Sequence, residues 1–190
     1  MKLLIVLVAS TMAGGVMAAG VTYDIDPNHS YPSFDADHMG GLSVWRGKFT
    51  KTSGKVVLDR AAKSGSIDVT VATDSIDYGH EKMNEHARSA ELFDVAKFPT
   101  ATFQGKFSKF AGANPTQATG TFTLKGVSQP LTLNIRQFLC KKNPINGKEV
   151  CGADATASFD RSKFGMDLGK AYGFKMGVNL QIQVEAIRAE

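Results

Sequence analysis

The sequence predicts an all-β protein, an antiparallel β-barrel of about eight strands with one short helical segment near a barrel mouth. Residues 173–190 alternate apolar and polar side chains with hardly a break, which is the period of a long strand with one buried face. A long strand needs equally long neighbours. A small domain supplies them most easily by closing its sheet into a barrel.

The earlier strands are predicted from the same alternation, with turn residues between them. The segments are residues 21–25, 42–50, 54–59, 67–71, 103–107, 122–124, 131–139 and 153–159. Residues 42–50 and 54–59 are typical of a hairpin. In the segment 131–139, Leu139 is expected on the same face as Leu131 and Ile135 because their numbers have the same parity.

One segment departs from this pattern and favours a helix. Residues 80–95 are rich in helix formers, and Met83, His86 and Ala87 fall on one helical face. Ser89 is expected to cap the first amides of a second short turn. Such a helix either covers a barrel mouth as a lid or packs on the outer wall, and its spacing does not distinguish the two.

Small residues on the predicted inner face raise the question of what fills the barrel. Gly105, Ala153, Ala155 and Ala157 are expected to point inward between phenylalanine rings. Protein interiors pack densely, so such a lumen either encloses an apolar ligand or is filled by the rings. Both alternatives stay open at this point, because the chain has 12 Phe residues.

The N-terminus has the features of a secretory signal peptide. Lys2 precedes the apolar run Leu3 to Ala9, and small residues lead to a cleavage site after Ala18 or Ala19. The run is too short to span a bilayer. The predicted division is a signal peptide at residues 1–18 and a barrel domain at 19–190, located in the periplasm.

The charge of the mature chain argues against a nucleic-acid partner. Without Lys2 it has 21 basic and 18 acidic residues, a net charge of +3, and the basic residues are spread along the chain. Nucleic-acid-binding proteins usually carry a basic stripe.

The two cysteines of an exported chain are expected to pair. Cys140 and Cys151 flank a segment with the turn signals Asn143-Pro144 and Asn146-Gly147. A disulfide would hold the neck of a hairpin and stabilise the fold by about 2–3 kcal/mol.

No catalytic motif or metal-ligand spacing is recognisable in the sequence. The four histidines are scattered, so we predict no catalytic residues and no metal site, and the chain is not expected to be an enzyme. Polar residues at predicted strand ends can instead form a ring at the barrel mouth. The ring consists of His29, Ser30, Asp77, Arg161 and Ser162. Arg161 is the expected partner for an anion or a quinone oxygen, because its guanidinium offers several donors.

The chain resembles the YceI family of exported bacterial proteins in the order of several short motifs. The matching segments are Tyr23-x-x-Asp26-x-x-His29-Ser30 with Phe34 and His38, Gly47-Lys48-Phe49, Ser75-Ile76-Asp77, Glu85-His86-Ala87-Arg88-Ser89, Leu92-Phe93-Asp94-Val95 with Phe98-Pro99, residues 121–130, and Arg161-Ser162-Lys163-Phe164-Gly165-Met166. Two positions depart from the family pattern, Tyr78 in place of Thr and Ala87 in place of Leu.

The resemblance implies a lipocalin-like barrel with a polyisoprenoid or ubiquinone-like lipid in its pore and no covalent cofactor. The expected partner is therefore an amphiphilic isoprenoid lipid, with a homodimer and transient membrane contact as further expectations. The residues expected to bind the ligand are Phe34, His38, Phe49, Ile76, Met83, Leu92, Phe93, Phe103, Phe107, Phe122, Phe159, Arg161, Phe164 and Met176.

Three functions follow from these features. The first is a carrier for an isoprenoid lipid. The second is a stress-response or protein-interaction module of the cell envelope, which an exposed patch around Trp45 would favour. The third is an enzyme acting on such lipids, with His29, His38 or Arg161 as acid–base groups.

Overall fold

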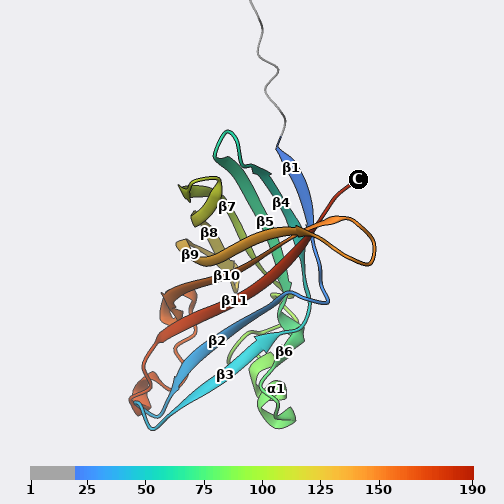
Figure 1. Ribbon diagram of the computed structural model, residues 1–190. Coiled ribbons are helices and arrows are strands. Elements are labelled where there is room, and N and C mark those ends of the chain that lie inside the picture. Colours follow the sequence, from blue (N-terminus) through green and yellow to red (C-terminus); the bar gives the residue numbers. More distant parts are fainter. Residues whose placement is uncertain (1–19) are drawn as a thin grey trace, which may run out of the picture.

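The computed structural model describes residues 20–190, which form an antiparallel β-barrel with one helix beside one end (Figure 1). The predicted signal peptide, residues 1–18, lies outside the described residues. Among residues 20–190, no helix has the length and hydrophobicity that a bilayer-spanning segment needs.

Eleven strands, one α-helix and three 3-10 turns make up the described chain. The strands are β1 (Val21–Ile25), β2 (Tyr31–His38), β3 (Ser43–Phe49), β4 (Thr52–Asp59), β5 (Ser64–Ala72), β6 (Ile76–Asp77), β7 (Thr100–Ala111), β8 (Asn114–Leu124), β9 (Val127–Lys142), β10 (Glu149–Asp160) and β11 (Gly177–Arg188). The helix is α1 (Glu81–Arg88), and the 3-10 turns are η1 (Thr73–Ser75), η2 (Arg161–Phe164) and η3 (Lys170–Tyr172).

Strand β11 closes the barrel, which confirms the predicted architecture. Eight strands pair in the circular order β1-β4-β5-β7-β8-β9-β10-β11, and β11 pairs again with β1. The first half of β11 pairs with β2 instead, so β2, β3 and β6 extend the wall beyond the ring. Closure leaves the strands of the ring without free edges.

The predicted hairpin of residues 42–50 and 54–59 is wrong. Strand β3 pairs with β2 and β6, whereas β4 pairs with β1 and β5. Between β3 and β4, the backbone amide of Thr50 donates to the Ser75 carbonyl oxygen, and the amide of Lys51 donates to the Ser75 hydroxyl. Both distances are 3.1 Å. The chain therefore bends here without reversing. The reversal occurs between β2 and β3, where Met39, Gly40 and Gly41 all have positive φ.

A β-bulge corrects the expected orientation of Leu139. Asp154 of β10 pairs with Gln137, but Ala155 pairs with Ile135, so β9 carries one extra residue. The side-chain alternation is shifted beyond this point, which leaves Leu139 58% exposed and turns Phe138 inward.

Two predicted elements are shorter in the structure. Strand β11 begins at Gly177, because the backbone amides of Phe174 and Lys175 donate to the Gly169 carbonyl oxygen and the Asp37 carboxylate instead of to a neighbouring strand. Helix α1 ends at Arg88 instead of continuing to residue 95. The hydroxyl of Ser89 then accepts a hydrogen bond from the Glu91 amide at 3.3 Å, so the predicted second turn begins there.

The Thr52 hydroxyl is the one buried side-chain polar atom in residues 20–190 that makes no hydrogen bond. Burying an unpaired hydroxyl costs about 1–3 kcal/mol. We therefore expect Thr52→Val to raise the free energy of unfolding by about 1 kcal/mol, measured by urea denaturation.

Thr73→Val is the matched control for this substitution. Thr73 is equally buried, but its hydroxyl donates to the Phe98 carbonyl oxygen at 2.7 Å. The control should lower stability by about 1 kcal/mol. Equal destabilisation by both variants would contradict the assignment of Thr52 as an unpaired group.

Candidate ligand-binding site

The barrel encloses an apolar cavity with a volume of about 570 Å³, which is in the usual range of ligand pockets. Its wall comes from the inward side chains of nearly every strand. Along β11, every second residue from Val178 to Ala186 lines it. These residues span about 26 Å along the strand, so the cavity is elongated.

The exposure of the lining residues locates the mouth. Tyr172 and Leu168 line the cavity and are nevertheless 81% and 39% exposed, so the cavity reaches the surface beside them. At the other end the lining residues Tyr23, Leu58 and Ala186 are all buried. The cavity is therefore closed at that end.

Helix α1 lies at the mouth, which decides between the two alternatives left open by the sequence. Its residues Met83 and His86 line the cavity, while Ala87 is fully buried in the core. Figure 1 shows α1 beside β6 at the end of the barrel to which β2 and β3 extend. The helix is thus a partial lid.

Phenylalanine rings fill only part of the interior. Ala153 and Ala155 line the cavity as expected, whereas Gly105 and Ala157 do not. At Gly105 the ring of Phe103 occupies the inner face, because an added Cβ atom would lie 2.8 Å from it. Space remains where β10 presents alanines.

Eleven of the fourteen residues predicted to bind ligand line this cavity. They are Phe34, His38, Phe49, Met83, Leu92, Phe93, Phe103, Phe107, Phe122, Phe159 and Arg161.

The other three, Ile76, Phe164 and Met176, are not lining residues. Ile76 is buried in the core cluster that includes Ala87. Phe164 packs against Phe159, with ring centroids 5.3 Å apart. Met176 directly precedes β11 and is half-buried outside the cavity wall.

Trp45 faces the cavity, which removes the observation that would have favoured an interaction patch around it. Its ring lies between His38 and Tyr78, at centroid distances of 5.6 and 5.7 Å. The neighbouring Val44 is the exposed residue, and the ladder between β2 and β3 is regular here.

Arg161 is buried at the start of η2 and contributes a positive charge to the cavity wall. Its two terminal nitrogens donate to the carbonyl oxygens of Met166 at 2.6 Å and Leu168 at 2.7 Å, which hold the loop that borders the mouth. Burial lowers the pKa of Arg161, although a guanidinium still stays protonated in proteins. Three of its five N–H donors are not used by these two bonds.

Tyr78 supplies a second polar group to the cavity wall. Burial raises the pKa of Tyr78 to about 12, and the nearby charge of Arg161 lowers it in part. The phenol is therefore neutral at physiological pH and can donate or accept a hydrogen bond. Together, Arg161 and Tyr78 form a donor-rich part of an otherwise apolar wall.

The remaining residues of the predicted mouth ring do not join this group. Ser30 lines the cavity, but its hydroxyl bonds the backbone of Glu185. His29, Asp77 and Ser162 are not lining residues. Their side chains bond neighbouring groups instead, with His29 Nδ1 lying 2.7 Å from a carboxylate oxygen of Asp26. The structure therefore does not assemble His29, His38 and Arg161 into one acid–base set.

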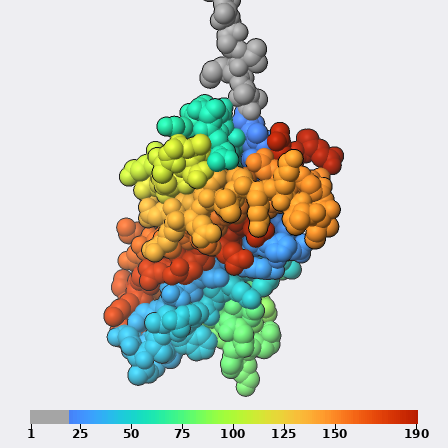
Figure 2. Space-filling model, viewed as in Figure 1, coloured from blue at the N-terminus to red at the C-terminus, as the bar shows by residue number. Residues whose placement is uncertain are grey.

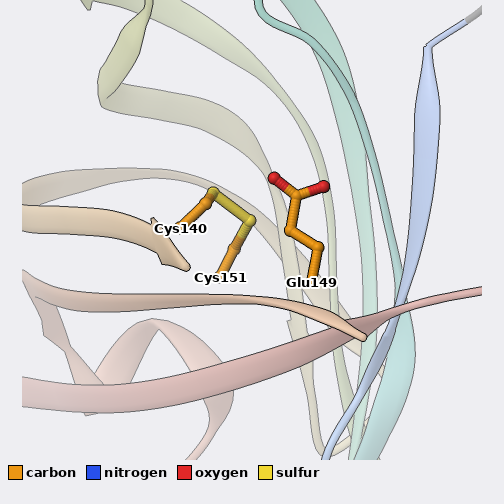
Figure 3. A group of neighbouring side chains, drawn as sticks. All are labelled: Cys140, Glu149 and Cys151. Carbon is orange, nitrogen blue, oxygen red and sulfur yellow. A yellow bond between two sulfur atoms is a disulfide. The ribbon is translucent and has the colours of Figure 1, made fainter. Parts of the chain in front are cut away.

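The closed end carries the disulfide between Cys140 and Cys151, as predicted (Figure 3). The two cysteines pair directly in the β9–β10 ladder. Glu149 lies beside them and accepts a hydrogen bond from the Tyr23 hydroxyl at 3.2 Å. Since the two sulfur atoms are bonded to each other, this cluster has a structural role and cross-links β9 to β10.

The residues at the mouth were only partly recognisable from the sequence. Tyr172 and Leu168 come from a loop with no periodic pattern, so nothing in the sequence indicated that they border a cavity. Trp45 and Tyr78 reach the mouth from neighbouring strands and their connections. Only the alternation around Trp45 contained a usable signal.

A closed antiparallel barrel around an elongated apolar cavity, with a mouth beside a short helix, defines the class of lipocalin-like ligand-binding barrels. Within that class, the YceI-like domain family model matches residues 23–186, and the chain belongs to this family. It is 33% identical to Protein YceI from Salmonella arizonae, covering 92% of this chain and 90% of that protein. A UPF0312 protein from Pseudomonas paraeruginosa is also 33% identical, with 93% and 91% covered.

Solved structures with the same fold include two informative examples. BcnA from Burkholderia cenocepacia matches with a TM-score of 0.69 and 24% identity, covering 85% of this chain and 99% of that one. A polyisoprenoid binding domain from Saccharophagus degradans matches with a TM-score of 0.63 and 14% identity, covering 89% and 99%. At these identities the likeness shows the fold alone.

Proposed function

We propose that this protein is an exported carrier that holds a long-chain isoprenoid lipid, of ubiquinone or polyprenyl type, in the barrel lumen. The observation that supports this most directly is the elongated apolar cavity, open beside α1 and closed at the other end. The polyisoprenoid binding domain from Saccharophagus degradans, which has the same fold, agrees with this proposal.

The cavity suits the tail of such a lipid. Each buried methylene group contributes about 0.8 kcal/mol to binding, so a long tail supplies strong affinity without specific contacts. The closed end limits the length of tail that fits. A cavity of this shape therefore selects for chain length.

Arg161 and Tyr78 give the ligand an orientation. A lipid whose polar head accepts hydrogen bonds from them has its tail directed along β11 toward Ala186. Under this proposal the quinone or phosphate oxygen lies near the mouth, where the ligand also enters. The reverse orientation would bury the head group among apolar residues at a cost of several kcal/mol.

The proposal is tested by loading the purified protein with a ubiquinone and, separately, with squalene, an isoprenoid hydrocarbon without a head group. Native mass spectrometry should find one molecule of either lipid bound. Arg161→Gln should weaken quinone binding about tenfold or more and leave squalene binding unchanged. Lys163→Gln, an exposed neighbour in the same turn, is the matched control.

Two results would contradict the proposal. If the protein is isolated empty and takes up neither lipid, the cavity is not a lipid site. If Arg161→Gln weakens both lipids equally, Arg161 supports the loop at the mouth and does not contact a head group.

The predicted signal peptide supports a periplasmic location for this carrier. The subunit number stays a prediction, which the same native mass spectra would measure.

A further inference from the structure

Exposed apolar side chains gather around the mouth of the cavity. Of the eight large apolar residues that are exposed in residues 20–190, five lie on two loops there. They are Met39, Leu42 and Val44 from the β2–β3 hairpin, and Leu168 and Tyr172 from the segment between β10 and β11. We call these five residues the mouth rim.

The two loops of the mouth rim are held side by side. The backbone amide of Lys175 donates to a carboxylate oxygen of Asp37 at 2.9 Å. The adjacent residues also meet: the ring of His38 contacts the ring of Phe174, with centroids 5.4 Å apart. The five apolar side chains therefore belong to one end of the molecule, and Figure 2 shows the β2–β3 hairpin (blue) beside α1 (green) at that end.

The mouth rim is continuous with the cavity. Tyr172 and Leu168 belong both to the exposed rim and to the cavity wall, so an apolar path leads from the surface to the interior. Leu42 is 74% exposed and Tyr172 81% exposed, so neither contributes much to the core. Several exposed apolar side chains gathered at one end of a monomer are typical of an interaction site.

The charges around the rim identify the kind of partner. Arg46 pairs with Asp35 at 3.3 Å and Lys170 pairs with Asp167 at 3.9 Å, while the ammonium of Lys175 lies beside Gly41 and forms no ion pair with the described residues. With two of these three cations paired, the rim has only a weak positive charge. Tyrosine and lysine beside leucine and methionine are typical of segments that rest in the interface of a bilayer, where the lysine heads stay in water.

We propose that the mouth rim inserts into the surface of a lipid bilayer, with Leu42 and Tyr172 as its principal anchors. This rests on the proposed lipid-carrier function and specifies where the carrier exchanges its cargo. With the rim inserted, an isoprenoid tail passes between bilayer and cavity without crossing water. Because only a few side chains insert and most of the nearby cations are paired, binding is reversible and depends weakly on salt.

The test is co-sedimentation of the full chain with neutral phosphatidylcholine vesicles. Leu42→Asp and Tyr172→Asp should each weaken vesicle binding roughly tenfold, because each removes the burial of one large side chain. Transfer of a fluorescent isoprenoid between two vesicle populations should slow by a similar factor. Raising the salt concentration from 0.1 to 0.5 M should change wild-type binding less than twofold.

Ile145→Asp is the matched control. Ile145 is 93% exposed in the β9–β10 turn, beside the closed end of the barrel, so its replacement should leave vesicle binding unchanged. An equal loss in the control variant would overturn the proposal. So would binding only to anionic phosphatidylglycerol vesicles with release by salt, or wild-type protein that does not bind vesicles.

Lipid loading and vesicle binding are measured separately, so a missing docking surface can be distinguished from a missing carrier function. Equilibrium loading from dispersed lipid, measured without vesicles, should be equal in wild type and Leu42→Asp, because Leu42 does not line the cavity. A protein that loads but does not bind vesicles retains the carrier function and lacks the docking surface. If the protein binds vesicles but never takes up lipid, the docking surface is supported and the carrier function is contradicted.

Discussion

Ala155→Phe should abolish the uptake of a long-chain isoprenoid while leaving the barrel folded. Ala155 is buried in β10, lines the cavity and pairs with Ile135 and Ile182 on its two neighbours, midway along the barrel. A phenyl ring there obstructs the passage toward the closed end. A tail that loses even four methylene groups of contact loses about 3 kcal/mol, a factor of 100 or more in affinity.

Ser158→Phe is the control for this substitution, since Ser158 is exposed on the outer face of the same strand. It should bind lipid like the wild type. A short-chain quinone should still bind Ala155→Phe, because the half of the cavity beside the mouth remains open. Wild-type affinity of Ala155→Phe for a long-chain lipid, with native circular dichroism, would show that the tail does not enter the barrel.

Loss of the disulfide is expected to have the largest effect on stability. The double substitution Cys140→Ala and Cys151→Ala should lower the free energy of unfolding by about 2–3 kcal/mol, since the bridge closes a short loop in the unfolded chain. Urea denaturation measures the difference. Reduction of the wild type with dithiothreitol should move its midpoint to that of the double variant.

The same double variant should still bind the isoprenoid in the native state. The bridge lies in the closed-end cluster with Tyr23 and Leu58, far along the barrel from the mouth. A variant with unchanged stability would mean that the closed-end packing alone holds the β9–β10 neck. Loss of lipid binding by a folded double variant would mean that the closed end shapes the ligand site directly.

The barrel could be predicted from the sequence because alternation is a local property. A residue's parity along a strand decides which face its side chain occupies, and the inward faces of β10 and β11 followed from it. The prediction failed where one extra residue enters a strand. At the bulge in β9, Arg136 and Gln137 are both exposed, and no feature of the sequence marks the change.

The candidate site was predictable to the extent that strands form it. Phe34, Phe103 and Phe159 were expected to line the lumen and do so. Tyr172 and Leu168 come from an irregular loop, and its position depends on the bonds from Arg161 and on contact with the β2–β3 hairpin.

The sequence by itself determined the fold class, the side of each regular strand that faces inward, and the cysteine pair, because period-two hydrophobicity and turn chemistry act between near neighbours. Only the tertiary structure decided which strands pair, where β11 changes partner from β2 to β1, and which end of the barrel is open. Alternation specifies a face but not a partner. Pairing is set by contacts between residues far apart in the chain, such as the 155 positions that separate Ser30 from Glu185.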